Sequence, residues 1–292
     1  MAYGAARSPA EIPAYLADIR GGRPAPPELL AQVTERYAAI GGSPLFAITD
    51  AQAAALSKAL AARGLPARVA VGMRHAEPTI AAAAAALAKE GIKAVVGLPL
   101  TPFQSRLSVG AYYKKLEEAA AGLAVRRVGD WHAHPRLVAA YAARTFEALA
   151  RVPEALRGRT ELLLTAHSLP SRILADGDPY PLQLEETAGL VAQACGFASW
   201  RFAYQSRGAG AEPWLGPDAG AVLEESAAAG AKAVVLCPVG FVSEHMETLY
   251  DIDVLYKGKA AALGLAFERA GALNDHPDFI AALADTAASG LP

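Results

Sequence analysis

The sequence predicts an α/β protein with two similar domains, each built on a parallel sheet. Short apolar runs rich in Val alternate with helical patterns along the chain, as in parallel doubly wound sheets. The segment at residues 91–99, Gly-Ile-Lys-Ala-Val-Val-Gly-Leu-Pro, returns at 230–238 as Gly-Ala-Lys-Ala-Val-Val-Leu-Cys-Pro. The 292 residues are 53% apolar, which is enough for two domain cores.

The first half is expected to alternate between helices and strands. Ser8 and Glu11 have capping-box spacing, with Pro9 at the first helical position, which predicts a helix to about residue 19. A Gly- and Pro-rich loop at 20–27 separates it from the next helix. Further helices are predicted at residues 28–40, 51–63, 77–90, 108–121 and 135–150, and strands at 68–72, 93–98 and 124–128.

The second half repeats this order. Strands are predicted at residues 161–165, 200–205 and 231–236, and helices at 181–195, 220–229, 243–256 and 277–287. Pro153, Gly158 and several charges interrupt the apolar pattern near residues 151–159. We therefore expect an N-terminal domain at 1–150 and a C-terminal domain at 151–292, with the last helix packing back on the first domain.

Charge and cysteine content exclude several functional classes. The 27 Lys and Arg nearly balance the 29 Asp and Glu, which argues against a nucleic-acid partner. Two cysteines are too few for an iron–sulfur cluster or a secreted disulfide framework, so a reducing cytoplasm fits best. The longest apolar stretch, residues 80–88, is too short to span a bilayer, and we expect no membrane insertion.

The segment at 237–256 carries a dense group of polar side chains. It follows the predicted buried strand at 231–236, so it lies where open α/β sheets bind ligands, beyond the carboxyl end of a strand. Ser243 can cap a helix there, and His245 and Glu247 follow closely. Glu247 and Asp251 are four residues apart and share a helical face. An ordinary acidic first turn, favoured by the helix dipole, is the alternative interpretation.

A histidine follows another predicted strand. Residues 162–170 read Leu-Leu-Leu-Thr-Ala-His-Ser-Leu-Pro, which leaves His167 and Ser168 beyond the carboxyl end of the strand at 161–165. An imidazole there can exchange protons near neutral pH or bind a divalent metal. A histidine that only caps a turn is the alternative. Ser168 lacks the G-x-S-x-G context of a nucleophilic serine.

Three further segments leave their role open. His132 and His134 are two residues apart and suit either a metal pair or a surface loop. Arg20 and Arg23 flank two glycines and form a basic pair for carboxylates or a solvated loop. The long loop at 204–218 mixes hydrogen-bond donors with an indole, which is typical of a functional or mobile loop.

Together these segments resemble the ferrochelatase family. Residues 165–170, Thr-Ala-His-Ser-Leu-Pro, are similar to that family's Ser-Ala-His-Gly/Ser-Leu-Pro. Residues 238–253, Pro-Val-Gly-Phe-Val-Ser-Glu-His-Met-Glu-Thr-Leu-Tyr-Asp-Ile-Asp, resemble a second signature. Further similarity lies at residues 1–4, 40–45, 72–78, 205–206 and 213–218, so the resemblance covers essentially the whole chain. It implies two Rossmann-like domains of the chelatase fold with a porphyrin cleft between them.

The resemblance also implies the reaction. The protein would be a lyase of heme biosynthesis that inserts Fe²⁺ into a porphyrin, with iron as a substrate and no cofactor. His167 would accept the pyrrole protons, Glu247 would face the centre of the macrocycle, and Asp251 would continue an acidic path, so all three are candidate metal ligands. Tyr3 would approach the ring from the other side. A downstream enzyme that accepts heme is the expected partner.

The loop after the first helix favours one substrate. At residues 19–23 it is short and polar, Ile-Arg-Gly-Gly-Arg, and resembles the soluble coproporphyrin ferrochelatases. Arg20, Arg36 and Ser43 match positions that hold propionates in those enzymes, and guanidinium groups suit carboxylates. We therefore expect coproporphyrin III as substrate. A protoporphyrin IX ferrochelatase, a sirohydrochlorin cobaltochelatase and a non-catalytic porphyrin or heme carrier are the alternatives.

Three departures from the family pattern concern metal entry and the chain start. Phe103 stands where the family often has a histidine, and Leu255 stands where a further acid often lies. Both residues shorten the polar route for the metal. Relatives carry apolar residues before Ala-Tyr-Gly, so Met1 is expected to be an internal methionine of a longer natural chain.

Overall fold

The computed structural model describes residues 1–120, 122–197, 199–208 and 212–291. They form two compact units, one made of residues 1–131 and 279–292 and the other of residues 132–278. The first unit takes up the end of the chain, as expected for the last helix. No helix within the described residues is long and apolar enough to cross a membrane.

The division between the units differs from the expected boundary near residues 151–159. It falls after Trp131, because α6 (Pro135–Arg151) packs against α8 and against strands β5 and β6 of the second unit. The break around Pro153 only ends α6 and leads into the short helix α7 (Glu154–Arg157). The residues from 132 to 150 therefore belong with the second unit.

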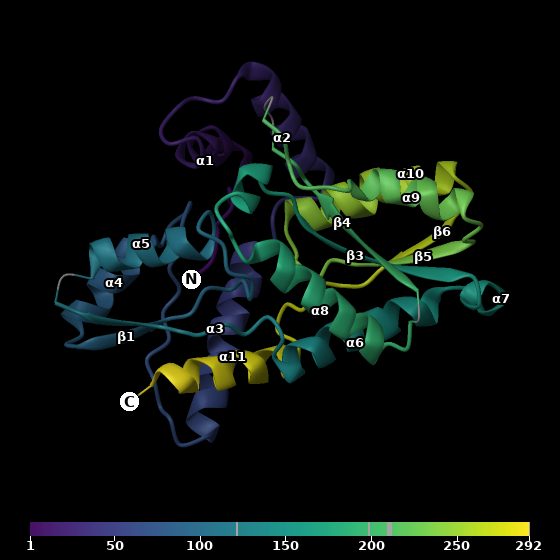
Figure 1. Ribbon diagram of the computed structural model, residues 1–292. Coiled ribbons are helices and arrows are strands. Elements are labelled where there is room, and N and C mark those ends of the chain that lie inside the picture. The colour runs from purple at the N-terminus through teal and green to yellow at the C-terminus, as the bar shows by residue number, and fades with distance from the viewer. Residues whose placement is uncertain (121, 198, 209–211, 292) are drawn as a thin grey trace. The chain divides into compact units, whose positions relative to one another are not determined.

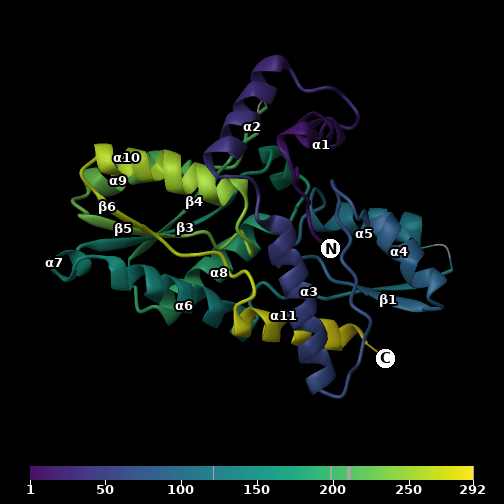
Figure 2. The same ribbon diagram turned by 180° about the vertical axis from the view of Figure 1, so that it is seen from behind.

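The second unit is a three-layer α/β sandwich. Its parallel sheet has the order β4-β3-β5-β6, with strands at Thr160–His167 (β3), Trp200–Gln205 (β4), Ala233–Cys237 (β5) and Ala266–Arg269 (β6). Helices α6 and α8 (Tyr180–Ala194) cover one face, and α9 (Ala219–Ala228) and α10 (Lys257–Ala262) cover the other (Figures 1 and 2). A sheet covered on both faces reads as continuous apolar strands, which is how β3 and β5 were recognised.

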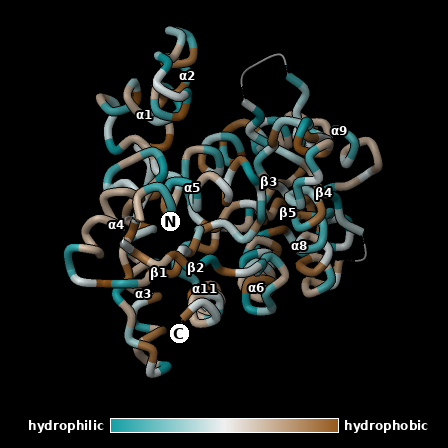
Figure 3. Tube along the Cα trace, turned by 60° about the vertical axis from the view of Figure 1, so that its left-hand side comes forward, coloured by the Kyte–Doolittle hydropathy of each residue, from teal (hydrophilic) through white to brown (hydrophobic). Residues whose placement is uncertain are grey.

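The core of this unit explains why its sheet edge is well defined. All five residues of β5 are buried, and so are the five from Leu162 to Ala166 in β3. Leu163, Val234 and Leu236 pack with Leu223 of α9 and Ile252. Figure 3 shows hydrophobic residues gathered around these strands. Close packing on both faces fixes where each strand ends, and the site is built on those ends.

The first unit has a smaller sheet and more helix. Strands β1 (Ala94–Gly97) and β2 (Ala124–Arg127) are parallel. Its helical segments lie at Pro9–Glu11 (η1), Ile12–Ile19 (α1), Pro27–Ala39 (α2), Leu45–Ala62 (α3), Ile80–Lys89 (α4), Val109–Ala119 (α5) and Pro277–Gly290 (α11, from Phe279 on). Ile80 and Ala84 of α4 pack with Tyr112 and Leu116 of α5. Arg126 of β2 donates to the carbonyl of Gly290, which places the end of α11 beside this sheet.

The strand predicted at residues 68–72 is absent from the structure. Residues 68–72 and β1 both line a cavity of about 350 Å³. Ala2 forms a single bridge with Met73, and the amine of Met1 donates to the carbonyl of Leu98 over 2.6 Å. Burial lowers the pKa of that amine to about 5. No described segment forms a ladder along residues 68–72, so the prediction of a strand was wrong.

Two local predictions in the helices also differ from the structure. Ser8 does not cap η1 with its side chain, and Glu11 instead accepts from the backbone N–H of Arg7. Helix α4 begins only at Ile80, where Thr79 caps it by accepting from the N–H of Ala82. Both differences concern the first turn, where several capping side chains compete for the same free N–H groups.

Candidate active site

The candidate site lies at the carboxyl edge of the second unit's sheet. β3 continues two residues beyond its predicted end and finishes at His167, beside Gln205 at the end of β4. β5 finishes at Cys237 and leads through residues 238–246 into the helix that carries the acids. The strand ends therefore bring His167 close to this helix, as the position of both segments after strands predicted.

That helix is a π-helix rather than the expected α-helix. It runs from Glu247 to Tyr256 (η3), and its start is not capped by Ser243 as predicted. Instead Thr248 accepts from the backbone N–H of His245 over 3.0 Å. Thr248, Asp251 and Ile252 are its buried residues. A π-helix is rare, and π-helical turns are frequent at functional sites.

Glu247 lies between two imidazoles. Its Oε1 is 3.4 Å from Nε2 of His167, and its Oε2 is 3.4 Å from Nε2 of His245. The side chains of Glu247, His167 and His245 are 25%, 31% and 24% exposed, so all three are partly open to solvent. The carboxylate can therefore stabilise a positive charge on either ring while one face of the group stays accessible.

The tautomer of His167 is set by its other ring nitrogen. Nδ1 contacts the carbonyl of Ser168, which can only accept, so Nδ1 carries the proton and donates. Nε2 of the neutral ring is then free to accept a proton on the side of Glu247. The backbone around it is held firmly: Tyr180 donates to the carbonyl of His167 over 2.9 Å, and the Ser168 hydroxyl donates to the carbonyl of Leu215 over 2.8 Å. Ser168 is thus a structural residue.

The charges of this group shift the pKa values of its members in opposite directions. Burial lowers the pKa of His167, but the neighbouring Glu247 carboxylate, the Ser168 carbonyl and Asp251 outweigh it and raise the pKa above its ordinary value. Burial raises the pKa of Glu247, but His167 and His245 outweigh it and hold the pKa well below its usual range. Glu247 is therefore ionised at neutral pH, and His167 is a stronger base than a free imidazole.

Asp251 joins the group through β4. Its Oδ2 accepts from the hydroxyl of Ser206 over 2.6 Å, and Gln205 donates to the backbone carbonyl of Glu247 over 3.2 Å. Ser206 has a φ of 57°, a left-handed conformation that costs energy in a residue other than glycine. This strained residue directs a donor at the second acid of η3, and the charge of Asp251 acts on the pKa of His167.

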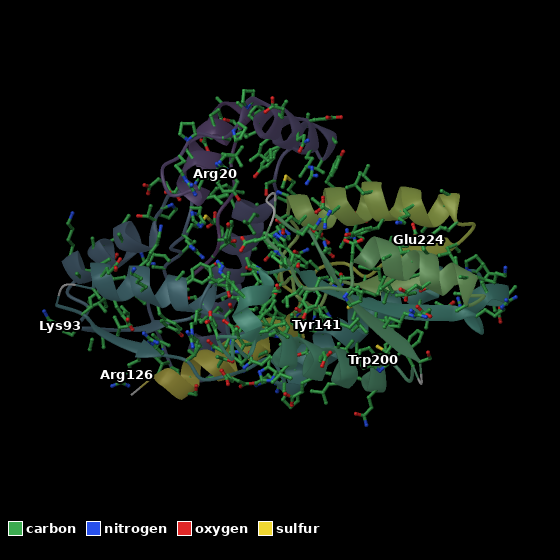
Figure 4. The ribbon with its side chains drawn as sticks, turned by 45° about the horizontal axis from the view of Figure 1, so that its top comes forward. Arg20, Lys93, Arg126, Tyr141, Trp200 and Glu224 are labelled. Carbon is green, nitrogen blue, oxygen red and sulfur yellow. The ribbon has the colours of Figure 1, made fainter. Side chains whose placement is uncertain are left out.

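The predicted substrate-binding residues lie in the first unit. Tyr3 is 42% exposed, and its ring centroid is 4.6 Å from that of His75. Arg20 follows α1 (Figure 4), Arg36 lies in the last turn of α2, and Ser43 lies in the turn before α3. Nε of Arg20 is buried and has no hydrogen-bond partner among the described residues. Their role in porphyrin binding stays a prediction.

Other candidates of the sequence have structural roles. His132 contacts Glu186 over 2.9 Å, and His134 caps α6 by accepting from the N–H of Arg136 over 3.2 Å. The loop at 204–218 includes residues 209–211, which lie outside the described residues. Across the described part of the chain, no three His, Cys, Asp or Glu side chains are grouped so that they could hold a metal ion.

At the two positions where the family often has a polar residue on the metal route, this chain has apolar side chains. Phe103 is fully buried, and Leu255 is 45% exposed on η3. Two residues that contact the acids of this region were not predicted as site residues. His245 was noted beside Glu247 but not named as a site residue, although its i, i+2 spacing to Glu247 was visible. Arg269 ends β6, a strand that was not predicted.

Comparison with known proteins identifies the family of this chain. A family model described as Ferrochelatase matches residues 1–291. A Ferrochelatase of Herpetosiphon aurantiacus is 40% identical over 96% of this chain and 94% of its own. The Coproporphyrin III ferrochelatases of Oceanobacillus iheyensis and Bacillus subtilis are 39% and 38% identical, over 98% and 97% of this chain and 93% and 94% of their own.

Solved structures show the same fold at much lower identity. SirB from Bacillus subtilis with Fe³⁺ aligns with a TM-score of 0.61 at 15% identity, over 82% of this chain and 87% of that one. CbiX, described as the terminal enzyme of siroheme biosynthesis in denitrifying bacteria, aligns with a TM-score of 0.55 over 86% and 95%. These likenesses confirm the predicted chelatase fold. From the whole-chain family match and the close relatives, the chain belongs to the ferrochelatase family, the lyases that insert iron into a porphyrin in heme biosynthesis.

Proposed function

We propose that this chain inserts Fe²⁺ into coproporphyrin III. The observation that carries the proposal is the contact between Nε2 of His167 and the carboxylate of Glu247 at 3.4 Å. Insertion releases two protons, since the porphyrin enters with two pyrrole N–H groups and leaves as a dianion around the metal. A basic imidazole next to a carboxylate suits this proton transfer.

In the proposed step, Nε2 of His167 accepts the proton of a pyrrole N–H group, and the pyrrole nitrogen then binds the entering metal. The imidazolium that forms donates to Oε1 of Glu247, which remains ionised because its pKa is held low. Glu247 would hold the proton only transiently and pass it to Nε2 of His245, which Oε2 contacts. The side chain of His245 is 24% exposed, so the proton leaves to solvent, Glu247 is ionised again and His167 is neutral for the second proton. Iron leaves in the product, so no resident cofactor is needed.

Two features favour coproporphyrin III over protoporphyrin IX. Two of the relatives described above carry that substrate in their names. Coproporphyrin III also has four propionates, and the buried, unpartnered Nε of Arg20 suits one of them. Arg36 and Ser43 are the other proposed propionate contacts.

The proposal is tested by anaerobic Fe²⁺ insertion into each porphyrin, followed by absorbance. We expect kcat/KM for coproporphyrin III to exceed that for protoporphyrin IX by about tenfold or more, since each charged hydrogen bond contributes about 1.5–3 kcal/mol. Arg20→Gln should raise KM for coproporphyrin III and leave kcat nearly unchanged. Arg68→Gln is the control, because Arg68 pairs with Glu90 on the surface of the same unit.

Each outcome decides between the alternatives. Equal or better use of protoporphyrin IX would refute the coproporphyrin assignment. Tight porphyrin binding without metallation by the wild-type chain would favour a carrier over an enzyme.

A further inference from the structure

A guanidinium links the end of β6 to both halves of the π-helix region. Nε and Nη2 of Arg269 donate to Oδ1 and Oδ2 of Asp253 over 2.7 and 2.9 Å, a bidentate pair. Nη1 donates to Oε1 of Glu244 over 2.8 Å. The side chains of Arg269 and Glu244 are 13% and 14% exposed. Bidentate Arg–carboxylate pairs fix geometry as well as charge.

Glu244 extends this link to the first turn of η3. It accepts from the backbone N–H of Ala272 over 2.9 Å and from the hydroxyl of Thr248 over 2.8 Å. Its own N–H donates to Oδ1 of Asn274 over 3.0 Å. A buried carboxylate with this many donors is fully satisfied, which offsets the desolvation cost of burying the ion pair. The segment after β6 and the bend before η3 are thereby joined.

The arginine therefore holds η3 on both sides of the acid that contacts the histidines. Glu244 lies three residues before Glu247, and Asp253 lies six residues after it. These contacts restrain the backbone before and after the first turn of η3. The two oxygens of Glu247 contact two different imidazoles at equal distances of 3.4 Å, an arrangement that a small shift of the helix would break.

We propose that Arg269 is a positioning residue for the metal-insertion reaction: by clamping Glu244 and Asp253 it places the carboxylate of Glu247 between His167 and His245. This inference rests on the proposed function. It predicts that removal of the clamp impairs turnover through Glu247 and not through porphyrin binding.

The same sheet offers a matched control. Arg201 on edge strand β4 and Arg269 on edge strand β6 lie in one row, because Arg201 is in register with Leu163, Leu163 with Leu236, and Leu236 with Arg269. Arg201 also joins two carboxylates, Glu161 at 3.1 Å and Glu225 at 2.7 Å. Neither of them lies in η3. Arg201→Gln thus removes an equivalent ion-pair group without touching the site.

The first experiment measures kcat and KM for Arg269→Gln and Arg201→Gln, alone and combined with Glu247→Gln. We expect Arg269→Gln to lower kcat by about 10- to 100-fold, as misplacement of a catalytic group by about 1 Å does. The KM for porphyrin should stay within about twofold, and Arg269→Lys should recover little of the rate, because lysine cannot bind a carboxylate through a planar fork. In the Glu247→Gln background, Arg269→Gln should cost almost nothing more, since both changes remove the same function.

Equal kcat for Arg269→Gln and Arg201→Gln, or effects of Arg269→Gln and Glu247→Gln that multiply in full, would overturn the proposal. Asp253→Asn serves as a second variant if Arg269→Gln does not fold, since it removes the bidentate pair and keeps the side-chain shape. It should show the same loss of kcat and the same non-additivity with Glu247→Gln.

A readout without turnover separates this inference from the proposed function. Histidine ring NMR signals, assigned with His167→Ala and His245→Ala, should both move in Arg269→Gln and stay in place in Arg201→Gln. Unmoved signals would overturn the role of Arg269 even in an active enzyme. If the signals move in Arg269→Gln while the wild-type chain metallates no porphyrin, the clamp would be supported and the proposed reaction refuted.

Discussion

The two units build their sheets from nearly the same strand sequence and use it differently. Ala-Val-Val forms the start of both β1 and β5, and the glycines three residues before them, Gly91 and Gly230, both have positive φ values of 83° and 93°. β5 is buried throughout between β3 and β6. β1 is only partly buried, and among the described residues it pairs with β2 alone.

The segments after these strands differ more than the strands do. After β5, Gly240 lies so close to β3 that a Cβ there would be 2.5 Å from the Cβ of Ala166, next to His167. Thr101 occupies the equivalent position after β1, and Phe103 follows it in a fully buried site. The strand repeat therefore provides the scaffold in both units, while the chemistry depends on the residues that follow the strand.

Removing the acid that only the second unit carries should have the largest effect. Glu247→Gln is expected to lower kcat by about 10²- to 10³-fold, within the usual range for a group that assists proton transfer. His167 must be neutral to accept a proton, and Glu247 raises its pKa. Loss of the carboxylate lowers that pKa, so the acidic limb of the kcat/KM profile should move to lower pH. A limb that stays in place would show that Glu247 does not act on His167.

Replacing Phe103 of the first unit with the histidine that the family often has at this position should not speed up metal insertion. Phe103 is fully buried, so Phe103→His is expected to cost about 3 kcal/mol in the free energy of unfolding and to leave the metal-insertion rate no higher. Urea unfolding and the absorbance assay measure both quantities. Phe146→His is the control, since Phe146 is 48% exposed. A faster enzyme would place Phe103 on the metal route after all.

The close contact between Gly240 and Ala166 is a second feature of the second unit that can be tested. Gly240→Ala should lower the free energy of unfolding by about 1–3 kcal/mol, because the added methyl overlaps Ala166. The rate should fall as well, since Ala166 precedes His167. Gly158→Ala is the matched control: its Cβ would meet nothing within 4 Å, and its stability should change by less than about 0.5 kcal/mol. Similar behaviour of both variants in denaturant unfolding would contradict the packing argument.

Breaking the buried ion pairs of the second unit should have the smallest effect, and it should appear in how Tm depends on pH. Burial raises the pKa of Glu244, but Arg269, Ala272 and Thr248 outweigh it and lower the pKa below its ordinary value. A carboxylate whose pKa is lower in the folded state than in the unfolded state stabilises the fold at any pH above its unfolded-state pKa. This stabilisation is lost as the pH falls through the folded-state pKa. The Tm difference between wild type and Arg269→Gln should therefore stay nearly constant from pH 7 down to about 4.5, the ordinary pKa of Glu, and shrink below that pH. Arg63→Gln, which breaks the more exposed Arg63–Asp285 pair of the first unit, should give a small and nearly constant difference.

The fold was largely predictable because its signals are local and repeated. The apolar runs of β3, β4 and β5 and the helices between them follow from periodicity, and the site follows from the rule that ligands bind beyond strand ends. The positions of His167, Glu247 and Asp251 beyond strand ends were predicted in this way, and the structure brings His167 and Glu247 into contact. Their roles were expected only from the resemblance and stay predictions.

What was missed depends on tertiary structure. β6 has four half-buried residues, one of them Arg269, and carries no apolar pattern that separates it from a loop. Ten residues of helix do not distinguish a period of 3.6 from that of a π-helix, so η3 was expected to be an α-helix. The sequence of α6 does not show which sheet the helix packs against, so the boundary between the units was predicted after α6 instead of before it.

The most direct test of the central claim is the single-turnover rate of anaerobic Fe²⁺ insertion into coproporphyrin III by His167→Ala. The account predicts that this variant still binds the porphyrin, measured by fluorescence quenching, and metallates it at least about 10²-fold more slowly than wild type. His134→Asn, which keeps a residue suited to cap α6, should match wild type. Metallation by His167→Ala at the wild-type rate would show that the pyrrole protons leave through another group.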